Sequence, residues 1–365
     1  MDANSFGLSM PAPLRIGNAM ATNGRPRVHM FGDPNAPSFS DNFRQDAPTS
    51  AQQDIQQLAQ IPQNTSPSIT DRYAYLRRLA SSSEGIVGLA QHISTIQPRV
   101  MKIVRHRNRP LREARALQLA GPHRNLIKMF EVEYNPSGEG IMVLEYCKGG
   151  DLHSQIRHFA ITNVQAPEEV VLHAMAQIAE ALAFIHGGWT KGRSDICWRV
   201  TDVNHTHIVH GDIKPENILI RPPHFGNGLP DFVLADFGQA FKKDVEVSTG
   251  GGTNGFRAPE YYFAHKPPLT AKADVYAYGI TMLHLCQGHR APLFGCGQPP
   301  GEVRVPQYLH GSGAESFLRE CLQFEPNDRL DMAPQNALMY ANFFRNRVEV
   351  LSKNAFYPYD MWASL

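Results

Sequence analysis

The feature that most constrains this chain is an ordered set of three short motifs in its C-terminal half. The first is HGDIKPEN at residues 210–217, followed by the apolar run Ile218–Ile220. The second, DFG at 236–238, stands directly after the apolar run 232–235, and the third, APE, stands at 258–260. Short apolar runs bounded by polar residues predict strands. The first two motifs are therefore expected to lie on loops between β-strands.

These two loops carry a distinctive set of polar groups. They combine two carboxylates, one ammonium group and one carboxamide, from Asp212, Asp236, Lys214 and Asn217. Carboxylate and amide oxygens are ligands that Mg²⁺ accepts, and a lysine can neutralise the charge of a phosphoryl group. The chemistry points to a site that handles phosphate together with a divalent cation.

Charge and cysteine content exclude several classes of protein. Lys and Arg number 35 and Asp and Glu number 34, so no global charge favours nucleic acid as a partner. No basic segment followed by an apolar stretch opens the chain, and no 18-residue apolar run occurs, so neither a signal peptide nor a membrane span is expected. Five cysteines without a CxxC motif favour free thiols in the cytoplasm or nucleus.

The first 70 residues differ in composition from the rest of the chain. They are rich in Asn, Gln, Ser, Pro and Ala and contain no lysine. Such a segment buries too little apolar area to offset the entropy of ordering it, so residues 1–70 are predicted to form a disordered tail with one short helix around 51–59. A flexible tail without a specific role and a docking or regulatory segment are the two alternatives.

The remaining chain changes from strand-like to helical patterns. Strand-like runs are predicted at 73–79, 86–93, 98–104, 126–133 and 140–146, with one helix at 111–119. After residue 150 the apolar spacing becomes helical, at 170–185 and 273–285. Strands followed by helices predict an α+β chain in two lobes. The predicted segments are an N-lobe at 71–147, a C-lobe at 148–346 and a C-terminal tail at 347–365.

With HxDxKPEN, DFG and APE in this order, the chain resembles the eukaryotic protein kinases from about Tyr73 to Asn346. The lysine two residues after the first aspartate is similar to the serine/threonine kinases. The resemblance implies the bilobal kinase fold, with a small β-rich N-lobe containing one main helix and a larger, mainly helical C-lobe. It also implies ATP and Mg²⁺ as cofactors and transfer of the γ-phosphate to Ser or Thr hydroxyls of a protein substrate.

The resemblance assigns a role to each polar residue of the motifs. Asp212 would be the catalytic base and Lys214 would stabilise the phosphoryl group in transit, while Asn217 and Asp236 would hold Mg²⁺. Thr253, before the APE motif, would contact Asp212 and Lys214 through its hydroxyl group.

An ion pair in the N-terminal half should complete the catalytic set. Lys102 is the first lysine of the chain and lies within the strand-like run 98–104. Glu113 is the only carboxylate between Lys102 and Phe130 and belongs to the predicted helix. These two residues are therefore assigned as the phosphate-contacting lysine and its glutamate partner.

The family resemblance also places the nucleotide site. The glycine-rich loop is assigned to 83–88, with a serine in place of the first glycine, and Leu144 is assigned as the gatekeeper behind the adenine. The backbone of Glu145 and Cys147 would bind the adenine edge, with Ala90 and Val100 covering the ring. The expected nucleotide-binding residues are Gly85, Gly88, Ala90, Val100, Lys102, Leu144, Glu145, Cys147 and Asp151.

Two departures from the family pattern leave alternatives open. Gly211 stands where most kinases have arginine (an HGD form), so activity is expected not to require phosphorylation between 239 and 256. Together with Ser83, Gly211 favours a rival interpretation, a pseudokinase acting as a nucleotide-binding scaffold. A small-molecule kinase is the second rival. Against it, Glu260 should pair with Arg329, and Asp274 should accept N–H groups from the catalytic loop.

Residues 187–208 form an expected insertion on the C-lobe. The family has only a few residues at this position, whereas this segment contains Trp189 and Trp198. It is predicted to be either a solvated loop or a surface that binds a partner.

Overall fold

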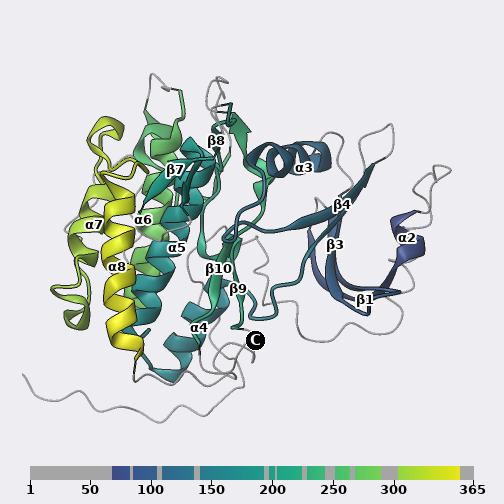
Figure 1. Cartoon of the computed structure of the whole chain (residues 1–365), viewed down its shortest axis with the longest axis horizontal. Coiled ribbons are helices and arrows are strands. Elements are labelled where there is room, and N and C mark those ends of the chain that lie inside the picture. Colours follow the sequence, from purple (N-terminus) through teal and green to yellow (C-terminus); the bar gives the residue numbers. More distant parts are fainter. Residues whose placement is uncertain are drawn as a thin grey trace, which may run out of the picture. The chain divides into compact units, whose positions relative to one another are not determined.

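Five strands in the N-terminal half pair into one antiparallel sheet (Figure 1). The computed structural model describes residues 68–82, 85–104, 109–134, 140–192, 197–201, 204–223, 228–242, 251–263, 268–288 and 303–353. All of these belong to one compact unit. The sheet order is β1-β2-β3-β5-β4, comprising β1 (Tyr73–Ser82), β2 (Gly85–His92), β3 (Pro98–Val104), β5 (Gly140–Glu145) and β4 (Met129–Tyr134).

The two faces of this sheet bury different side chains, because successive residues of a strand point to opposite sides. On one face, Val100 and Leu144 join the main core together with residues of α3 (Arg109–Ala120). On the other face, Met101 and Val143 belong to a smaller, separate cluster. The short helix α2 (Ile69–Arg72) is capped by Ser68 and adds Ile69 to this smaller cluster.

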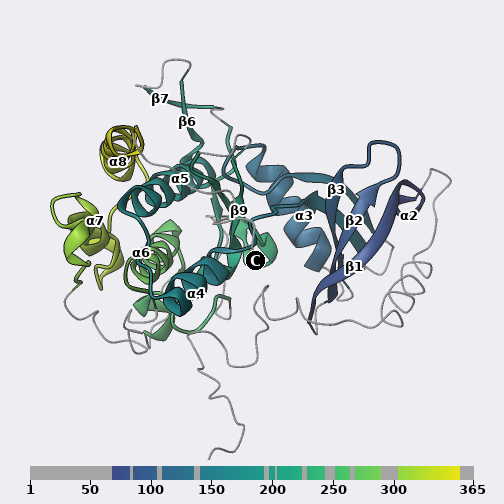
Figure 2. The ribbon, with the colours of Figure 1, turned by 90° about the horizontal axis from the view of Figure 1, so that it is seen from below.

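The C-terminal half is mainly helical (Figure 2). Its helices are α4 (Leu152–Thr162), α5 (Glu168–Gly187), α6 (Ala271–Gln287), α7 (Ala314–Cys321) and α8 (Ala337–Ser352). By length and composition α5 could cross a membrane, but 89 % of its apolar stretch is buried inside the protein. It is therefore the central helix of the core.

Three short antiparallel strand pairs lie among these helices. The pairs are β9 (Ile218–Arg221) with β10 (Asp231–Leu234), β8 (Ile208–Val209) with β11 (Phe241–Lys242), and β6 (Trp189–Lys191) with β7 (Trp198–Val200). Short 3₁₀ turns flank the motif strands: η1 (Pro215–Asn217) precedes β9 and η2 (Phe237–Gln239) follows β10. Further 3₁₀ turns are η3 (Pro259–Tyr262) in the APE region, η5 (Gln307–Leu309) and η6 (Pro326–Asp328). The β9–β10 pair presents Asn217 and Asp236 at the same end.

The α+β, two-lobed architecture predicted from the sequence is confirmed. Strand β3 matches its predicted bounds, whereas β4 begins at Met129 and not at Leu126. Leu126 instead forms a bridge with Leu234, which ties the start of β4 to β10. Helix α8 continues past residue 346 to Ser352, and the predicted insertion contains the β6–β7 hairpin. The helix predicted at 51–59 lies outside the described residues.

Candidate active site

Lys102 contacts two carboxylates, one on α3 and one in the C-terminal half. The alternation of β3 places Lys102 on the same face as Val100, towards α3. Its Nζ lies 2.7 Å from Oε2 of Glu113 on α3 and 2.9 Å from Oδ1 of Asp236. The ion pair predicted with Glu113 is therefore present, and Asp236 extends it across 134 residues of sequence.

Burial and charge set the protonation of this triad. Burial alone would lower the pKa of Lys102, but Asp236 and then Glu113 outweigh it and raise that pKa above its usual range. Burial would raise the pKa of Asp236, but the Lys102 ammonium brings it down to about 2. Burial raises the pKa of Glu113 even though Lys102 opposes this effect. Lys102 is thus charged, and Asp236 is an anion at neutral pH.

A local backbone turn aims the Asp236 carboxylate. Asp236 has φ of +60°, in the left-handed region that only a minority of non-glycine residues adopt. Asp236 is the N-cap of the 3₁₀ turn η2, and its Oδ1 accepts from the N–H of Gly238. The next residue, Phe237, is fully buried against the ring of His210 at a centroid distance of 4.7 Å. Burial of Phe237 therefore fixes the turn that directs Asp236 towards Lys102.

A second cluster surrounds Asp212 on the loop between β8 and β9. The Thr253 hydroxyl donates to Asp212 Oδ1 at 2.7 Å and accepts from Lys214 Nζ at 2.8 Å. Lys214 Nζ also lies 3.2 Å from Asp212 Oδ2. Asn217 Nδ2 donates to the Asp212 carbonyl at 2.8 Å. The four side chains form one hydrogen-bonded group although Thr253 lies 41 residues from Asp212.

Asp274, at the start of α6, binds the backbone of the loop that carries Asp212. Its carboxylate accepts from the backbone N–H of His210 at 2.7 Å and of Gly211 at 2.9 Å, as the sequence predicts. His186 at the end of α5 also lies 2.8 Å from Asp274, a contact that sequence reasoning missed. Two helices therefore hold the backbone of the loop that carries Asp212.

Gly211 occupies a backbone conformation that suits glycine. Its φ is +79°, and a Cβ atom at this position would lie 3.0 Å from the carbonyl oxygen of Gln239. A side chain here would meet both backbone strain and a close contact. The local geometry of position 211 therefore favours glycine.

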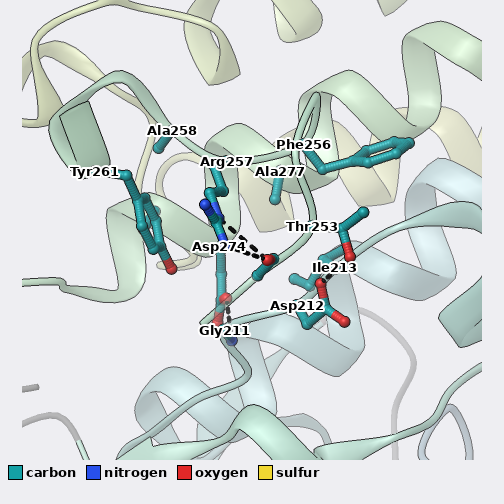
Figure 3. A pocket seen from close by; sticks show the side chains of 12 residues that line it. Gly211, Asp212, Ile213, Thr253, Phe256, Arg257, Ala258, Tyr261, Asp274 and Ala277 are labelled. Atoms are coloured by element: carbon teal, nitrogen blue, oxygen red, sulfur yellow. Dashed lines mark hydrogen bonds between the residues drawn. The ribbon is translucent and has the colours of Figure 1, made fainter. Parts of the chain in front are cut away.

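Arg257 holds the segment that carries Thr253 (Figure 3). Its guanidinium donates to the carbonyls of Gly251 and Gly252, at 2.9 Å from Nε and 2.8 Å from Nη2 respectively, and to the side chain of Asn254 at 3.0 Å. Figure 3 shows Arg257 and Tyr261 on one side of a small pocket and Asp212 with Thr253 on the other. Arg257 was not recognised from the sequence, because its partners are mostly backbone carbonyls.

The residues expected to bind the nucleotide base lie at the end of β5 and in the segment that leads to α4. Leu144 and Val100 are buried on the face that carries Lys102. The N–H of Glu145 donates to the Lys128 carbonyl, and the carbonyl of Cys147 accepts from Gly150. Asp151 is buried, caps α4 by accepting from Ser154 N–H at 2.7 Å, and has a pKa raised by burial to about 6. Asp151 therefore has a structural role at the start of α4.

Two of the expected nucleotide-binding residues lie on the other face of the sheet. Ala90 is fully buried in the smaller cluster, and a Cβ atom at Gly88 would lie 2.2 Å from the Tyr75 ring. The structure does not bring them to the face of Val100 and Leu144, because β2 alternates with a period of two. Val87, which pairs with Lys102, points to that face and was missed.

Gly85 opens β2 at a position where a side chain has no room. A Cβ atom there would lie 1.9 Å from the carbonyl oxygen of Ile103. Close approach of two backbones is one of the uses of glycine. Its neighbours Ser83 and Glu84 lie outside the described residues.

Comparison with known proteins agrees with this geometry. The family model described as "Protein kinase domain" matches residues 73–340, more than half of the chain. A leucine-rich repeat receptor-like protein kinase, PEPR2 of Arabidopsis thaliana, is 34 % identical over 175 residues, which cover 46 % of this chain and 14 % of that protein. The G2-specific protein kinase nimA of Emericella nidulans is 27 % identical over 249 residues, 62 % of this chain and 34 % of that protein. The serine/threonine-protein kinase atg1 of Dictyostelium discoideum is 25 % identical over 248 residues, 64 % of this chain and 31 % of that protein. The chain thus spans about a third or less of the length of these relatives.

Proposed function

This chain belongs to the protein kinase family, and from that premise we propose that it transfers the γ-phosphoryl group of Mg·ATP to Ser or Thr hydroxyls of a protein substrate. The observation that carries this proposal is the hydrogen-bonded group of Asp212, Thr253 and Lys214. It supplies a proton acceptor and an ammonium group side by side, which phosphoryl transfer to a hydroxyl requires.

In the proposed reaction each polar group has one task. The Asp212 carboxylate accepts the proton of the substrate hydroxyl, while its hydrogen bond from Thr253 fixes its orientation. Lys214 neutralises charge on the phosphoryl group as it moves, and Lys102 does so on the other phosphates. Positioning and charge neutralisation supply most of the rate, since little covalent chemistry is needed.

Asn217 and Asp236 are suited to hold Mg²⁺. The Asn217 amide nitrogen donates to Asp212, so its amide oxygen is turned away from that bond. The Ala235 N–H donates to the Asn217 carbonyl, which places the residue before Asp236 beside Asn217. Asp236 is ionised because its pKa is held at about 2. Hard oxygen ligands of this kind match Mg²⁺, which would supply charge neutralisation on the phosphates.

The choice of serine or threonine as acceptor rests on the family pattern and the relatives. Lys214 two residues after Asp212 and Thr253 before APE follow the serine/threonine form, and atg1 is named a serine/threonine kinase. Three peptides that differ only in having Ser, Thr or Tyr as acceptor test this assignment by mass spectrometry. Phosphorylation of the Ser and Thr peptides is expected. A product from the Tyr peptide alone would contradict the assignment.

Loop phosphorylation should not control activity. Single Ser248→Ala and Thr249→Ala variants, at positions outside the described residues, are expected to keep initial rates within about tenfold of wild type, because Gly211 offers no counter-charge for a phosphate. Arg257 already binds the following segment through its carbonyls. Thr253→Ala is the contrasting variant and should lose more, since Thr253 donates directly to Asp212. A larger loss from Ser248→Ala or Thr249→Ala would contradict the prediction.

We propose a kinase domain over about 71–346 and partner binding through either residues 1–70 or the 187–208 segment. We also propose a cytoplasmic or nuclear location, since the five cysteines of the sequence form no CxxC motif.

A further inference from the structure

A charged network joins the hinge to the β9–β10 pair. The hinge comprises residues 145–150, from the last residue of β5 to the glycines before α4. Arg221 at the end of β9 forms a two-pronged pair with Glu145, from Nε to Oε1 at 2.7 Å and from Nη2 to Oε2 at 3.0 Å. Two parallel hydrogen bonds of this kind fix orientation as well as distance. The contact spans 76 residues of sequence.

The third guanidinium nitrogen of Arg221 is also engaged. Its Nη1 donates to the Arg124 carbonyl at 3.1 Å and to Asp231 Oδ2 at 3.2 Å. Asp231 lies directly opposite Arg221 in the β9–β10 ladder. All three nitrogens of Arg221 therefore have partners, on three different segments of the chain.

Asp231 extends the network to the body of the C-terminal half. Its Oδ1 accepts from Gln177 on α5 and from Arg124, each at 2.8 Å. The Gln177 side-chain oxygen in turn accepts from Phe232 N–H at 2.6 Å. Burial would raise the pKa of Asp231, but the hydrogen bond and charge of Arg124 lower it, so the carboxylate is charged. The network is anchored on the buried helix α5.

The backbone strengthens the same connection. Gly149 N–H donates to the Ile220 carbonyl at 3.0 Å, and Ile220 N–H donates to the Gly150 carbonyl at 2.8 Å. A Cβ atom at Gly149 would lie 2.8 Å from Ile220, so glycine permits this close approach. The hinge thus runs along β9. Arg221, the last residue of β9, lies beside Glu145 at the start of the hinge.

The strand pair that Arg221 clamps carries the proposed metal-binding residues. Asn217 directly precedes β9, and Asp236 follows β10 by two residues. The hinge carries the backbone that is expected to bind adenine. Arg221 and Asp231 lie at the opposite end of this strand pair from Asn217 and Asp236, so the connection from the hinge to the metal-binding residues runs through β9 and β10.

We propose that Arg221 is a positioning residue that fixes the hinge relative to Asn217 and Asp236 and thereby sets the affinity for Mg·ATP. This inference rests on the proposed function, since it assigns a nucleotide to the site. Loss of the fork would let the hinge shift, and small displacements in such a site weaken binding strongly. Lysine keeps the charge of Arg221 but lacks the planar fork, so it should restore only part of the effect.

Three variants of the full chain test this role. Arg221→Met removes the fork, Arg221→Lys keeps the charge, and Glu145→Gln removes the negative charge and one of the two acceptors on the hinge side. Arg319→Met, which breaks an exposed pair with Glu315 on α7, is the matched control. Isothermal titration with Mg·ATP gives Kd, and steady-state rates give KM for ATP, KM for peptide and kcat. Unfolding temperatures are measured beside them.

The expected pattern is specific to the nucleotide. Arg221→Met should raise Kd and KM for ATP by about tenfold, with kcat and KM for peptide within about twofold of wild type. Glu145→Gln should follow it, Arg221→Lys should lie between, and Arg319→Met should match wild type. Unchanged ATP affinity in Arg221→Met, or a loss confined to kcat and unfolding temperature, would overturn the positioning role alone. Wild-type protein that binds no Mg·ATP would overturn the proposed function and this inference together.

Discussion

Asp236→Asn is expected to lower the rate of phosphoryl transfer by roughly 10³-fold or more, because a carboxylate that neutralises metal charge contributes several kcal/mol. The substitution keeps the shape of the side chain and removes its charge. It also leaves Lys102 with Glu113 as its only carboxylate partner of the two that it contacts. The side chain of asparagine is a weaker ligand for Mg²⁺ than the Asp236 carboxylate.

The effect should be confined to chemistry and metal binding. Circular dichroism and thermal unfolding should show a folded protein, since the turn at Asp236 also rests on the buried Phe237. Glu315→Gln on α7 is the matched carboxylate-to-amide control at an exposed ion pair, and its rate should equal that of wild type. A rate for Asp236→Asn within about tenfold of wild type would contradict the assigned role.

Arg329→Met is expected to destabilise the fold by about 3–5 kcal/mol, the usual result of breaking a buried ion pair from one side. Both Glu260 and Arg329 are 3 % exposed, and they form two hydrogen bonds of 2.7 Å. Arg329 also donates to the carbonyls of Gln323, Phe324 and Lys272. The substitution would therefore leave a buried carboxylate and three carbonyls without their donor.

Chemical denaturation measures this free energy of unfolding. Glu260→Gln should also destabilise the protein, and the double variant should cost less than the sum of the single ones because the two residues act as a pair. Arg319→Met, at an exposed pair, should change stability by about 1 kcal/mol or less. If Arg329→Met lowered the free energy of unfolding by less than the exposed control does, the Glu260–Arg329 ion pair would not be formed in solution.

The sequence predicts the catalytic loop well because its chemistry is carried by closely spaced motifs. Asp212, Lys214 and Asn217 lie within six residues, so their proximity follows from local geometry. The partnership of Lys102 with Glu113 could be predicted because no other carboxylate lies in that stretch. These predictions succeeded because the residues are close in sequence or because no other carboxylate was available as a partner.

Predictions that depended on strand register were less successful. Gly88 and Ala90 were assigned from the family resemblance, but the register pairs Val87 with Lys102. A shift of one residue along a strand moves a side chain to the other face of the sheet. Counting alternation outward from Lys102 along the paired strands would have selected Val87.

Distant contacts that no family motif carries were missed, whereas the resemblance supplied the Glu260–Arg329 pair, 69 residues apart. Arg221 and Glu145 are 76 residues apart, and His186 and Asp274 are 88 residues apart. Nothing in the local pattern of either pair marks its partner, since each side chain alone is typical of an exposed strand end or a helix terminus. Only the packing of α5 and β9 beside the hinge and the catalytic loop brings these groups together.

The central claim is that the chain is an active, metal-dependent protein kinase. Phosphate incorporation from γ-labelled ATP, into the chain itself and into a generic Ser/Thr substrate, tests it most directly. We predict incorporation that requires Mg²⁺ and disappears in Asp236→Asn. No incorporation by well-folded wild-type protein, with several substrates and with either Mg²⁺ or Mn²⁺, would contradict the claim and favour a nucleotide-binding scaffold.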